Sequence, residues 1–370
     1  MEKMNFVKTV KITCAVYKDI SAKIIEALAE AGVSCYTVQS GRTVVLRERK
    51  RFLGLSHETV LEDDPSDVFR IYVRPESEEG LLTLLSQKAG LTTPGRGSLF
   101  SEEIGLLKQS DCFLNSPVRP KLKEKIPFAS DLTGICCIVQ RGQANPIIQN
   151  LLETGAVPTV TFGEGMGVRD KLGLLRIAIP TEKEVVSTVV SRYDAEQMMN
   201  ILIDVGRLDQ PGKGFIYLIP VRKGLINTKS QRGQRRTGAS VEQMVAAIDD
   251  LKGSSEWRKM EIVSKSAGRR KFLKDLVGFN LVTNDGRAID IVKAAMNAGA
   301  SGATISRFSQ TVPAETGVST AREISDLIVG KQQIPGLTKV VEAAGLFSKQ
   351  SAGLIETGPV PLACTYLGGK

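Results

Sequence analysis

Hydrophobic residues along the chain alternate between strand-like runs and helical spacing. An apolar run at 10–16 predicts a strand, and helically spaced apolar residues at 21–31, followed by Gly32, predict a helix. The remaining elements expected in this stretch are strands at 33–38, 68–73 and 98–100, a helix at 78–89, and a long polar loop at 40–67. The order strand, helix, strand, strand, helix, strand is typical of split βαβ, ferredoxin-like folds.

The same order recurs twice. The second copy has expected strands at 134–140, 157–162, 184–191 and after 214, with helices at 145–153 and 195–204; the third has strands at 277–282, 303–307 and 323–329, helices at 288–297 and 337–344, and a turn at 351–355. Glycines register the copies: first-helix stops at Gly32, Gly155 and Gly299, second-helix stops at Gly90, Gly206 and Gly345, and last-turn positions Gly97, Gly214 and Gly353. The sequence therefore predicts an α+β protein of tandem ferredoxin-like (βαββαβ) units. The expected domains are 1–127, ending in an extended linker at 105–127, 128–262 with a basic C-terminal extension, and a degenerate unit at 263–370.

One turn offers candidate chemistry. Gly212, Lys213 and Gly214 follow a Pro-Gly turn signal and precede an apolar strand-like run. Such a turn can present backbone N–H groups and one cation to a phosphate, although most short glycine-lysine turns are solvated connections.

Composition describes an ordinary globular protein. The chain has 370 residues, 42% hydrophobic and 24% charged, a length that favours two or three domains. No stretch approaches the ~20 apolar residues of a membrane span, and the N-terminus has no signal-peptide pattern. With six cysteines, no CxxC pair and the single histidine His57, a zinc site is disfavoured. Buried thiols in a reducing compartment, and hence a cytoplasmic location, are expected.

The net charge of +9 is concentrated locally. Basic residues crowd the stretch 222–274, which also contains a possible helix at 240–251. Three interpretations are open: a solvated linker, a nucleic-acid surface, or a site for a small anion. With only 5% aromatic residues, base stacking on single strands is disfavoured, so nucleotide phosphate fits better than a polymer.

The second unit resembles the PII signalling proteins and the wider PII-like superfamily. The resemblance rests on the element order, on a long loop after the second strand, and on the segment Pro211-Gly212-Lys213-Gly214-Phe215-Ile216-Tyr217, which is similar to the family's B-loop. The first unit has Pro94-Gly95-Arg96-Gly97 at the same place, and the third keeps only Gly353. Because the family forms homotrimers, the resemblance implies a single-chain pseudo-trimer.

The resemblance also implies adenine-nucleotide sites in the clefts between units, with ATP, ADP or AMP as effector and no required cofactor. The residues implied for the better site are Gly163, Gly165, Gly167, Gly212, Lys213, Gly214, Arg222 and Lys223. Those of a lesser site are Gln39, Arg42, Gly95, Arg96 and Gly97. In the third unit Ala352 replaces Lys213, so that cleft is expected to be empty or altered.

The family's role implies a non-enzymatic sensor whose long loops at 41–67 and 163–183 dock on an unidentified target protein, for instance in nitrogen or carbon metabolism. Neither loop has the glycine-arginine-glutamine signature of nitrogen-sensing PII proteins, which disfavours 2-oxoglutarate binding. One alternative is an enzyme that uses Glu164 and Asp170 of the 163–170 loop with a metal and phosphate. A second is a nucleic-acid binder through 222–274. No catalytic residue and no metal site are expected under the favoured interpretation.

Overall fold

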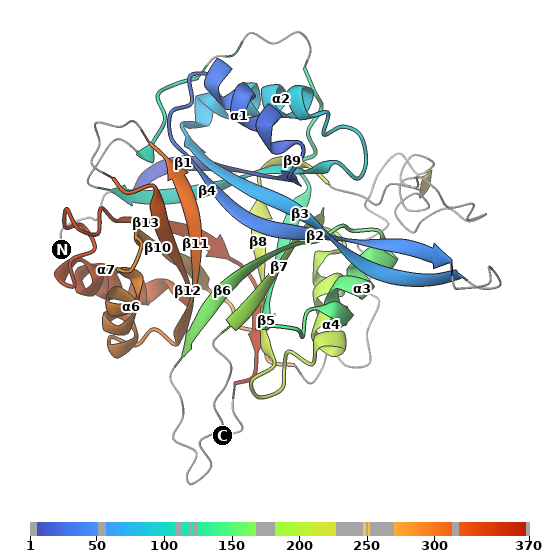
Figure 1. Cartoon of the computed structure of the whole chain (residues 1–370). Helices are drawn as coiled ribbons and strands as arrows, with labels where there is room; N and C mark the ends of the chain where they lie inside the picture. Colours follow the sequence, from blue (N-terminus) through green and yellow to red (C-terminus); the bar gives the residue numbers. More distant parts are fainter. Residues whose placement is uncertain are drawn as a thin grey trace.

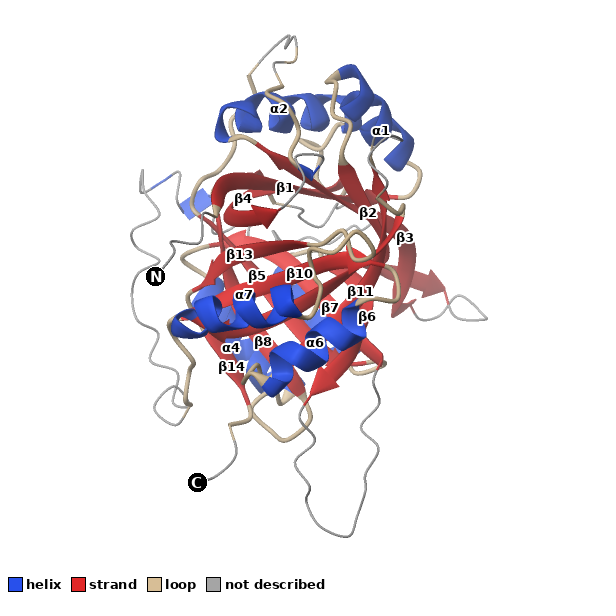
Figure 2. Cartoon of the chain, turned by 90° about the vertical axis from the view of Figure 1, so that its left-hand side faces the viewer, coloured by secondary structure: helices blue, strands red, loops and turns tan. Residues whose placement is uncertain are grey.

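The computed structural model has an α+β architecture in which strands form one large antiparallel sheet system and helices lie outside it (Figures 1 and 2). The structure describes residues 6–50, 57–108, 113–118, 120, 125–167, 182–226, 247–248, 251, 270–312 and 318–367. The α+β class is confirmed, and the element order is compatible with ferredoxin-like units. The helix expected at 240–251 lies, but for three residues, outside the described ranges.

The first unit follows the predicted order of elements. Its elements are β1 (Val7–Tyr17), α1 (Ser21–Glu30), β2 (Tyr36–Lys50), β3 (His57–Val73), the short 3-10 helix η1 (Pro75–Ser77), α2 (Glu78–Ala89) and β4 (Gly97–Lys108). The strands pair in the order β4-β1-β3-β2, all antiparallel.

The second and third units repeat this order of elements and strand pairing. The second contains β5 (Leu132–Gln140), α3 (Asn145–Thr154), β6 (Thr159–Gly167), β7 (Glu182–Ser191), α4 (Ala195–Gly206), β8 (Gly214–Val221) and β9 (Lys223–Leu225). The third contains β10 (Leu276–Asn284), α6 (Ala288–Asn297), β11 (Gly302–Thr311), β12 (Ala321–Gly330), η6 (Lys331–Gln333), α7 (Ile334–Ala343), β13 (Leu354–Val360) and β14 (Ala363–Thr365). Their strand orders are β8-β5-β7-β6 and β13-β10-β12-β11.

Each unit buries a core of its own between its two helices and its strands. In the first unit, Ile24 and Leu28 of α1 meet Leu81 and Leu85 of α2 above Ile12 of β1, and all five side chains are fully buried. The i, i+4 spacing places each helical pair on one face, and burying such a side chain contributes about 1.5–3 kcal/mol. Separate clusters serve the second and third units. Figure 1 shows the three helix pairs at the periphery, with the strands turned inward.

The prediction of a loop at 40–67 is wrong. Most of this region is a long hairpin of β2 and β3, in which Arg47 lies opposite Val60. Basic residues followed by acidic ones resemble a solvated loop in sequence, but here they pair across the two strands. Arg47 is 3.1 Å from Glu62 and 3.0 Å from Asp64, and Arg42 pairs with Asp63. Opposite charges facing across an antiparallel pair stabilise it.

One set of strand contacts between units closes a cycle. β2 pairs with β6 at Gly41 and Thr161, β6 pairs with β11 at Glu164 and Ile305, and β11 returns to β2 at Ser309 and Val38. Every unit therefore contributes its second strand to both of the other units.

A second cycle joins the last strand of each unit to another unit. β9 of the second unit pairs with β4 at 99–101, β14 of the third pairs with β8 at 215–217, and the end of β4 at 105–108 pairs with β13. The linker expected from residue 105 thus begins as a strand. Farther along, Asn115 holds the first unit together, because its side chain accepts from the N–H of Cys35 (3.0 Å) and donates to the carbonyls of Cys35 and Tyr72.

Candidate functional site

The turn before β8 is a tight turn in which two glycines adopt positive φ. Gly212 and Gly214 adopt φ of 69° and 149°, a region that disfavours residues with a Cβ. A Cβ at Gly214 would lie 2.5 Å from the carbonyl oxygen of Ile138, so the glycine permits close strand approach. Gln140 donates to the carbonyl of Gly212 (3.1 Å). No acidic side chain of the described chain lies within ion-pair distance of Lys213, which leaves its charge available.

The first unit has an equivalent turn before β4. Gly97 opposes Val16 of β1 as Gly214 opposes Val139 of β5. Gly95 and Gly97 adopt φ of 78° and 148°. Arg96 lies against Gly90, and its Nε is buried with no hydrogen-bond partner. Within the described ranges this guanidinium also has no carboxylate partner, so two of the three turns present an unneutralised cation.

The third turn is closed by a buried arginine. Ala352 adopts φ of 43°, and its carbonyl accepts a hydrogen bond from Arg322 Nη2 (2.8 Å). Arg322 is 1% exposed; it also donates to Asn284 and lies 5.2 Å from the ring centroid of Phe113. A side chain from inside the third unit therefore occupies this turn, which differs in this respect from the other two.

Arg222 and Lys223 do not lie beside the Gly212–Gly214 turn with which they were grouped. They follow the far end of β8, about 26 Å along an extended chain from that turn at ~3.3 Å per residue. The residues beside the turn come instead from the third unit, where Thr365 Oγ1 donates to the carbonyl of Gly214 (2.9 Å).

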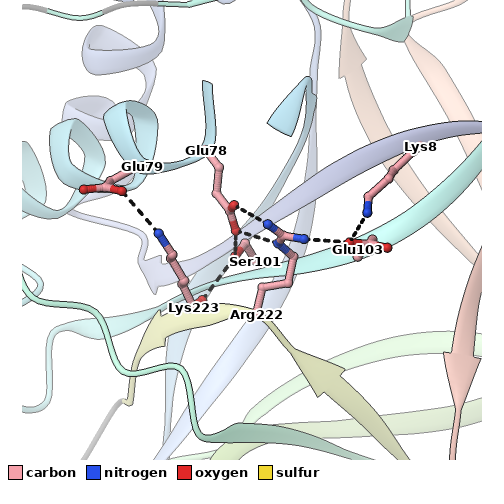
Figure 3. A network of polar contacts seen from close by, with 7 residues as sticks. All are labelled: Lys8, Glu78, Glu79, Ser101, Glu103, Arg222 and Lys223. Carbon is pink, nitrogen blue, oxygen red and sulfur yellow. Dashed lines mark hydrogen bonds and ion pairs between the residues drawn. The ribbon is translucent and has the colours of Figure 1, made fainter. Parts of the chain in front are cut away.

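Arg222 and Lys223 instead join the second unit to the first (Figure 3). Arg222 donates through Nε and Nη2 to both oxygens of Glu78 (3.1 Å each) and through Nη1 to Glu103 (2.6 Å). Lys223 pairs with Glu79 at 3.2 Å. The hydrogen bond from Lys8, with Arg222 nearby, lowers the pKa of Glu103. Both charges are therefore already neutralised by carboxylates.

We expect Arg222→Ala to lower the free energy of unfolding by about 1–2 kcal/mol, because it leaves the Glu78 carboxylate buried with Ser101 Oγ as its remaining hydrogen-bond donor among the described residues. Urea denaturation followed by circular dichroism measures the change. Lys223→Ala, which removes an exposed pair on the same strand segment, serves as the control and is expected to cost under ~1 kcal/mol. Equal losses in the two variants would contradict the assigned role of Arg222.

Gly163, Gly165 and Gly167 lie in strand β6, whereas the sequence placed them in a loop. A Cβ at Gly163 would lie 2.7 Å from Ser306 Oγ and 2.8 Å from the carbonyl oxygen of Ile305. The missing side chain at Gly163 therefore lets β11 approach, and at Gly165 the space is taken by the Lys183 side chain. The rest of the expected loop, from residue 168 to 181 and including Asp170, lies outside the described residues.

The two remaining candidates of the lesser site are separated from its turn. Gln39 is 3% exposed and accepts a hydrogen bond from Arg70 Nη1 (2.9 Å) in the interior. Arg42 reaches across to the second unit, where it pairs with Glu184 (2.7 Å) and lies 5.8 Å from the ring centroid of Phe162. Gly95–Gly97 is therefore the part of this site that retains free binding groups.

Three buried acids at equivalent positions were missed in the sequence. Asp67, Glu184 and Glu323 oppose Val16, Val139 and Thr283, and each is at most 4% exposed. Each accepts hydrogen bonds at the start of its unit's first helix, from Ser21 Oγ (2.7 Å), from the Gly142 and Ala144 N–H groups (2.9 and 3.3 Å), and from the Ala288 N–H (3.0 Å). An acid at the helix N-terminus is favoured by the helix dipole. The sequence signal that could have found them is an acidic residue at the same position of the third strand in all three units.

Little in the described part of the chain resembles a catalytic centre. The described cysteines are free and buried. Burial raises the pKa of Cys14 to about 12 and that of Cys136 to about 11, so neither is a thiolate at neutral pH. Within the described residues, no three His, Cys, Asp or Glu side chains group closely enough to hold a metal. No helix in the described ranges has the length and apolar character needed to cross a membrane.

Comparisons with known proteins give no family assignment. No family model matches the chain, and no curated protein matches it. A structural match is found with an aspartate kinase from Synechocystis, at 10% identity and a TM-score of 0.21. The match covers 95% of this chain and 43% of the kinase chain, so the chain spans less than half of that protein. A similarity at this TM-score carries no argument about function.

Proposed function

We propose that the chain is a PII-like regulatory protein, a single-chain pseudo-trimer that binds adenine nucleotide between its units. The two cycles of strand pairing between units support this assembly, since each unit contacts both others through equivalent strands. In such an assembly the turn before β8 lies next to β14 of the third unit, and the turn before β4 lies next to β9 of the second unit. Each of these turns therefore lies where two units meet, which is where the resemblance implies the nucleotide sites.

The observation that carries the proposal is the free cation in two equivalent glycine turns. Lys213 and Arg96 each lie between two glycines of positive φ, and neither has an acidic partner in the described part of the chain. A lysine or arginine flanked by glycines can place its charge on a phosphate that the missing side chains allow to approach. The nucleotide phosphates are therefore assigned to these turns, one in the second unit and one in the first.

The third turn is assigned no nucleotide. Arg322 already donates to the carbonyl of Ala352, and the backbone there is held by a buried side chain of the same unit. Two sites per chain are therefore the expected stoichiometry.

The regulatory output is assigned to the hairpin of β2 and β3. In Figure 1 this hairpin extends away from the helices and the rest of the sheet. Its base includes Arg42, which joins the first unit to Glu184 of the second. A nucleotide bound between units shifts the hairpin's equilibrium only by its difference in affinity between the hairpin's states. The docked target is a protein of unidentified class.

Calorimetric titration with ATP, ADP and AMP tests this proposal. We expect Lys213→Ala and Arg96→Ala each to weaken one of two sites about 10- to 100-fold, because a hydrogen bond to a charged group is worth about 1.5–3 kcal/mol. Lys349→Ala, which removes an exposed lysine beside the third turn, is the matched control and should leave affinity unchanged. Absence of binding by the wild-type chain would falsify the nucleotide proposal. Phosphate release from ATP that depends on Lys213 would contradict a non-enzymatic role.

A further inference from the structure

Strands from all three units enclose a cavity of about 160 Å³ at the centre of the molecule, and its lining includes none of the glycine-turn residues 95–97 and 212–214. Engineered cavities of ~150 Å³ hold molecules the size of benzene. The polar and charged side chains of its lining include Lys11, Gln39, Arg70, Glu102, Asp326 and Glu356.

The charges in the lining come from two units only. Arg70, Ser187 and Asp326 occupy the same register position, opposite Thr13, Cys136 and Asn280. The second unit is neutral at this position, while the first contributes a cation and the third an anion. The cavity is therefore polarised from one side to the other, which a site repeated three times would not be.

Most of these charges already have partners. Lys11 lies 3.3 Å from Glu102 and 2.5 Å from Glu356. Glu356 also accepts hydrogen bonds from Tyr72 (2.9 Å) and Asn280 (3.3 Å). Asp326, by contrast, forms no hydrogen bond and no ion pair with any described residue. Asp326 is therefore the carboxylate of the cavity that can still accept a hydrogen bond or an ion pair from a ligand.

The net charge of the cavity lining indicates the charge that a ligand of Asp326 would carry. Apart from Glu103, which pairs with Lys8 and Arg222, three carboxylates (Glu102, Asp326 and Glu356) face two cations (Lys11 and Arg70), which leaves one negative charge in excess when all are ionised. Burial raises the pKa of Asp326 to about 6, so this carboxylate is ionised at neutral pH. Asp326 is half-buried, and Arg70 and Lys11 attract its charge without forming a hydrogen bond or ion pair with it, so a bound monocation would neutralise the excess negative charge.

The wall of the cavity also carries apolar side chains, among them Val68, Val185, Ile324, Ile328 and Val360. We propose that the central cavity binds a small organic monocation, with an ammonium head on Asp326 and a short alkyl body against this wall. Glu103 also lines the cavity, and its side chain is 44% exposed, so the cavity extends toward solvent at that end.

Titration of the full-length chain with butylammonium chloride tests the inference. We expect saturable binding with one site per chain, weakened at least tenfold in Asp326→Asn. Ser187→Ala, at the neutral equivalent position, is the control and should change affinity less than about twofold. Gly278→Val should block binding without removing a charge. A Cβ at this cavity-lining glycine has no neighbour closer than 3.7 Å, so the valine side chain fits and occupies space that the ligand needs.

Affinity should also fall between pH 7.5 and pH 5, because protonating Asp326 removes the counter-charge. The titratable or charged groups around Asp326 are Arg70 of β3, Glu356 of β13, Lys11 of β1, Glu102 of β4, Cys136 of β5 and Tyr217 of β8. The Asp326→Asn variant should lack this pH dependence. Equal binding of neutral butanol, equal binding of potassium, or unchanged affinity in Asp326→Asn would each overturn the proposal.

Discussion

Replacing Lys11 by methionine should lower the free energy of unfolding by about 3–5 kcal/mol, because it leaves two buried carboxylates without their shared cation. The side chains of Glu102 and Glu356 are 8% and 2% exposed, and both lie within 3.3 Å of Lys11 Nζ. Burial alone would lower the pKa of Lys11, but the two carboxylates raise it overall. Urea denaturation at pH 7.5 measures the loss.

The pH dependence of the Lys11→Met variant identifies the cause. Without the lysine, burial holds the folded-state pKa of both glutamates above the unfolded value, so the destabilisation is present at neutral pH. It should shrink as pH falls and the carboxylates take up protons, and it should vanish only below the folded-state pKa of Glu356 in the wild type, which the charge of Lys11, against the effect of burial, holds below its usual value. The triple variant Lys11→Met, Glu102→Gln, Glu356→Gln should recover much of the loss at pH 7.5. A loss under about 1 kcal/mol in Lys11→Met would contradict the account.

Gly97→Ala should cost at least 3 kcal/mol of folding free energy, since the backbone and the neighbouring strand both disfavour a side chain there. Gly97 has φ of 148°, a conformation that costs other residues about 1–3 kcal/mol. An added Cβ would also lie 2.4 Å from the carbonyl oxygen of Ala15, so β1 and β4 must move apart. Thermal and urea unfolding measure the effect.

Gly286→Ala provides the control for this prediction. Gly286 also has positive φ (78°), but an added Cβ there would meet nothing within 4 Å. Gly286→Ala should therefore lower the free energy of unfolding only through the strained backbone conformation, by about 1–2 kcal/mol. If both variants lose the same stability, close approach of the strands is not what requires glycine at position 97.

Local signals in the sequence predicted the helices well. Apolar spacing and a following glycine placed α2 at 78–89 and α6 at 288–297, as observed. At the end of α4 the prediction was less accurate, because Gly206 is the last helical residue and Arg207 adopts the left-handed conformation. Helix ends depend on neighbours within one turn, which is why they can be read from sequence.

Features that depend on distant partners were not predictable in this way. The β2/β3 hairpin was read as a loop because Arg47 and Asp64 look solvated until they are seen to pair. Arg222 was grouped with the Gly212–Gly214 turn through the resemblance to the PII family, although its partner Glu78 lies 144 residues away in another unit. The central cavity likewise depends on contacts such as Lys11 with Glu356, which are 345 residues apart.

The cyclic pairing of strands between units has a consequence for the order of the folding reaction. An assembly of three separate chains folds with a stability that depends on concentration. Here β9, β14 and the end of β4 each reach another unit along the same polypeptide. A tether of this kind replaces bulk concentration by an effective concentration in the millimolar range for short flexible linkers. Folding is therefore unimolecular, and dilution in a cell cannot separate the units.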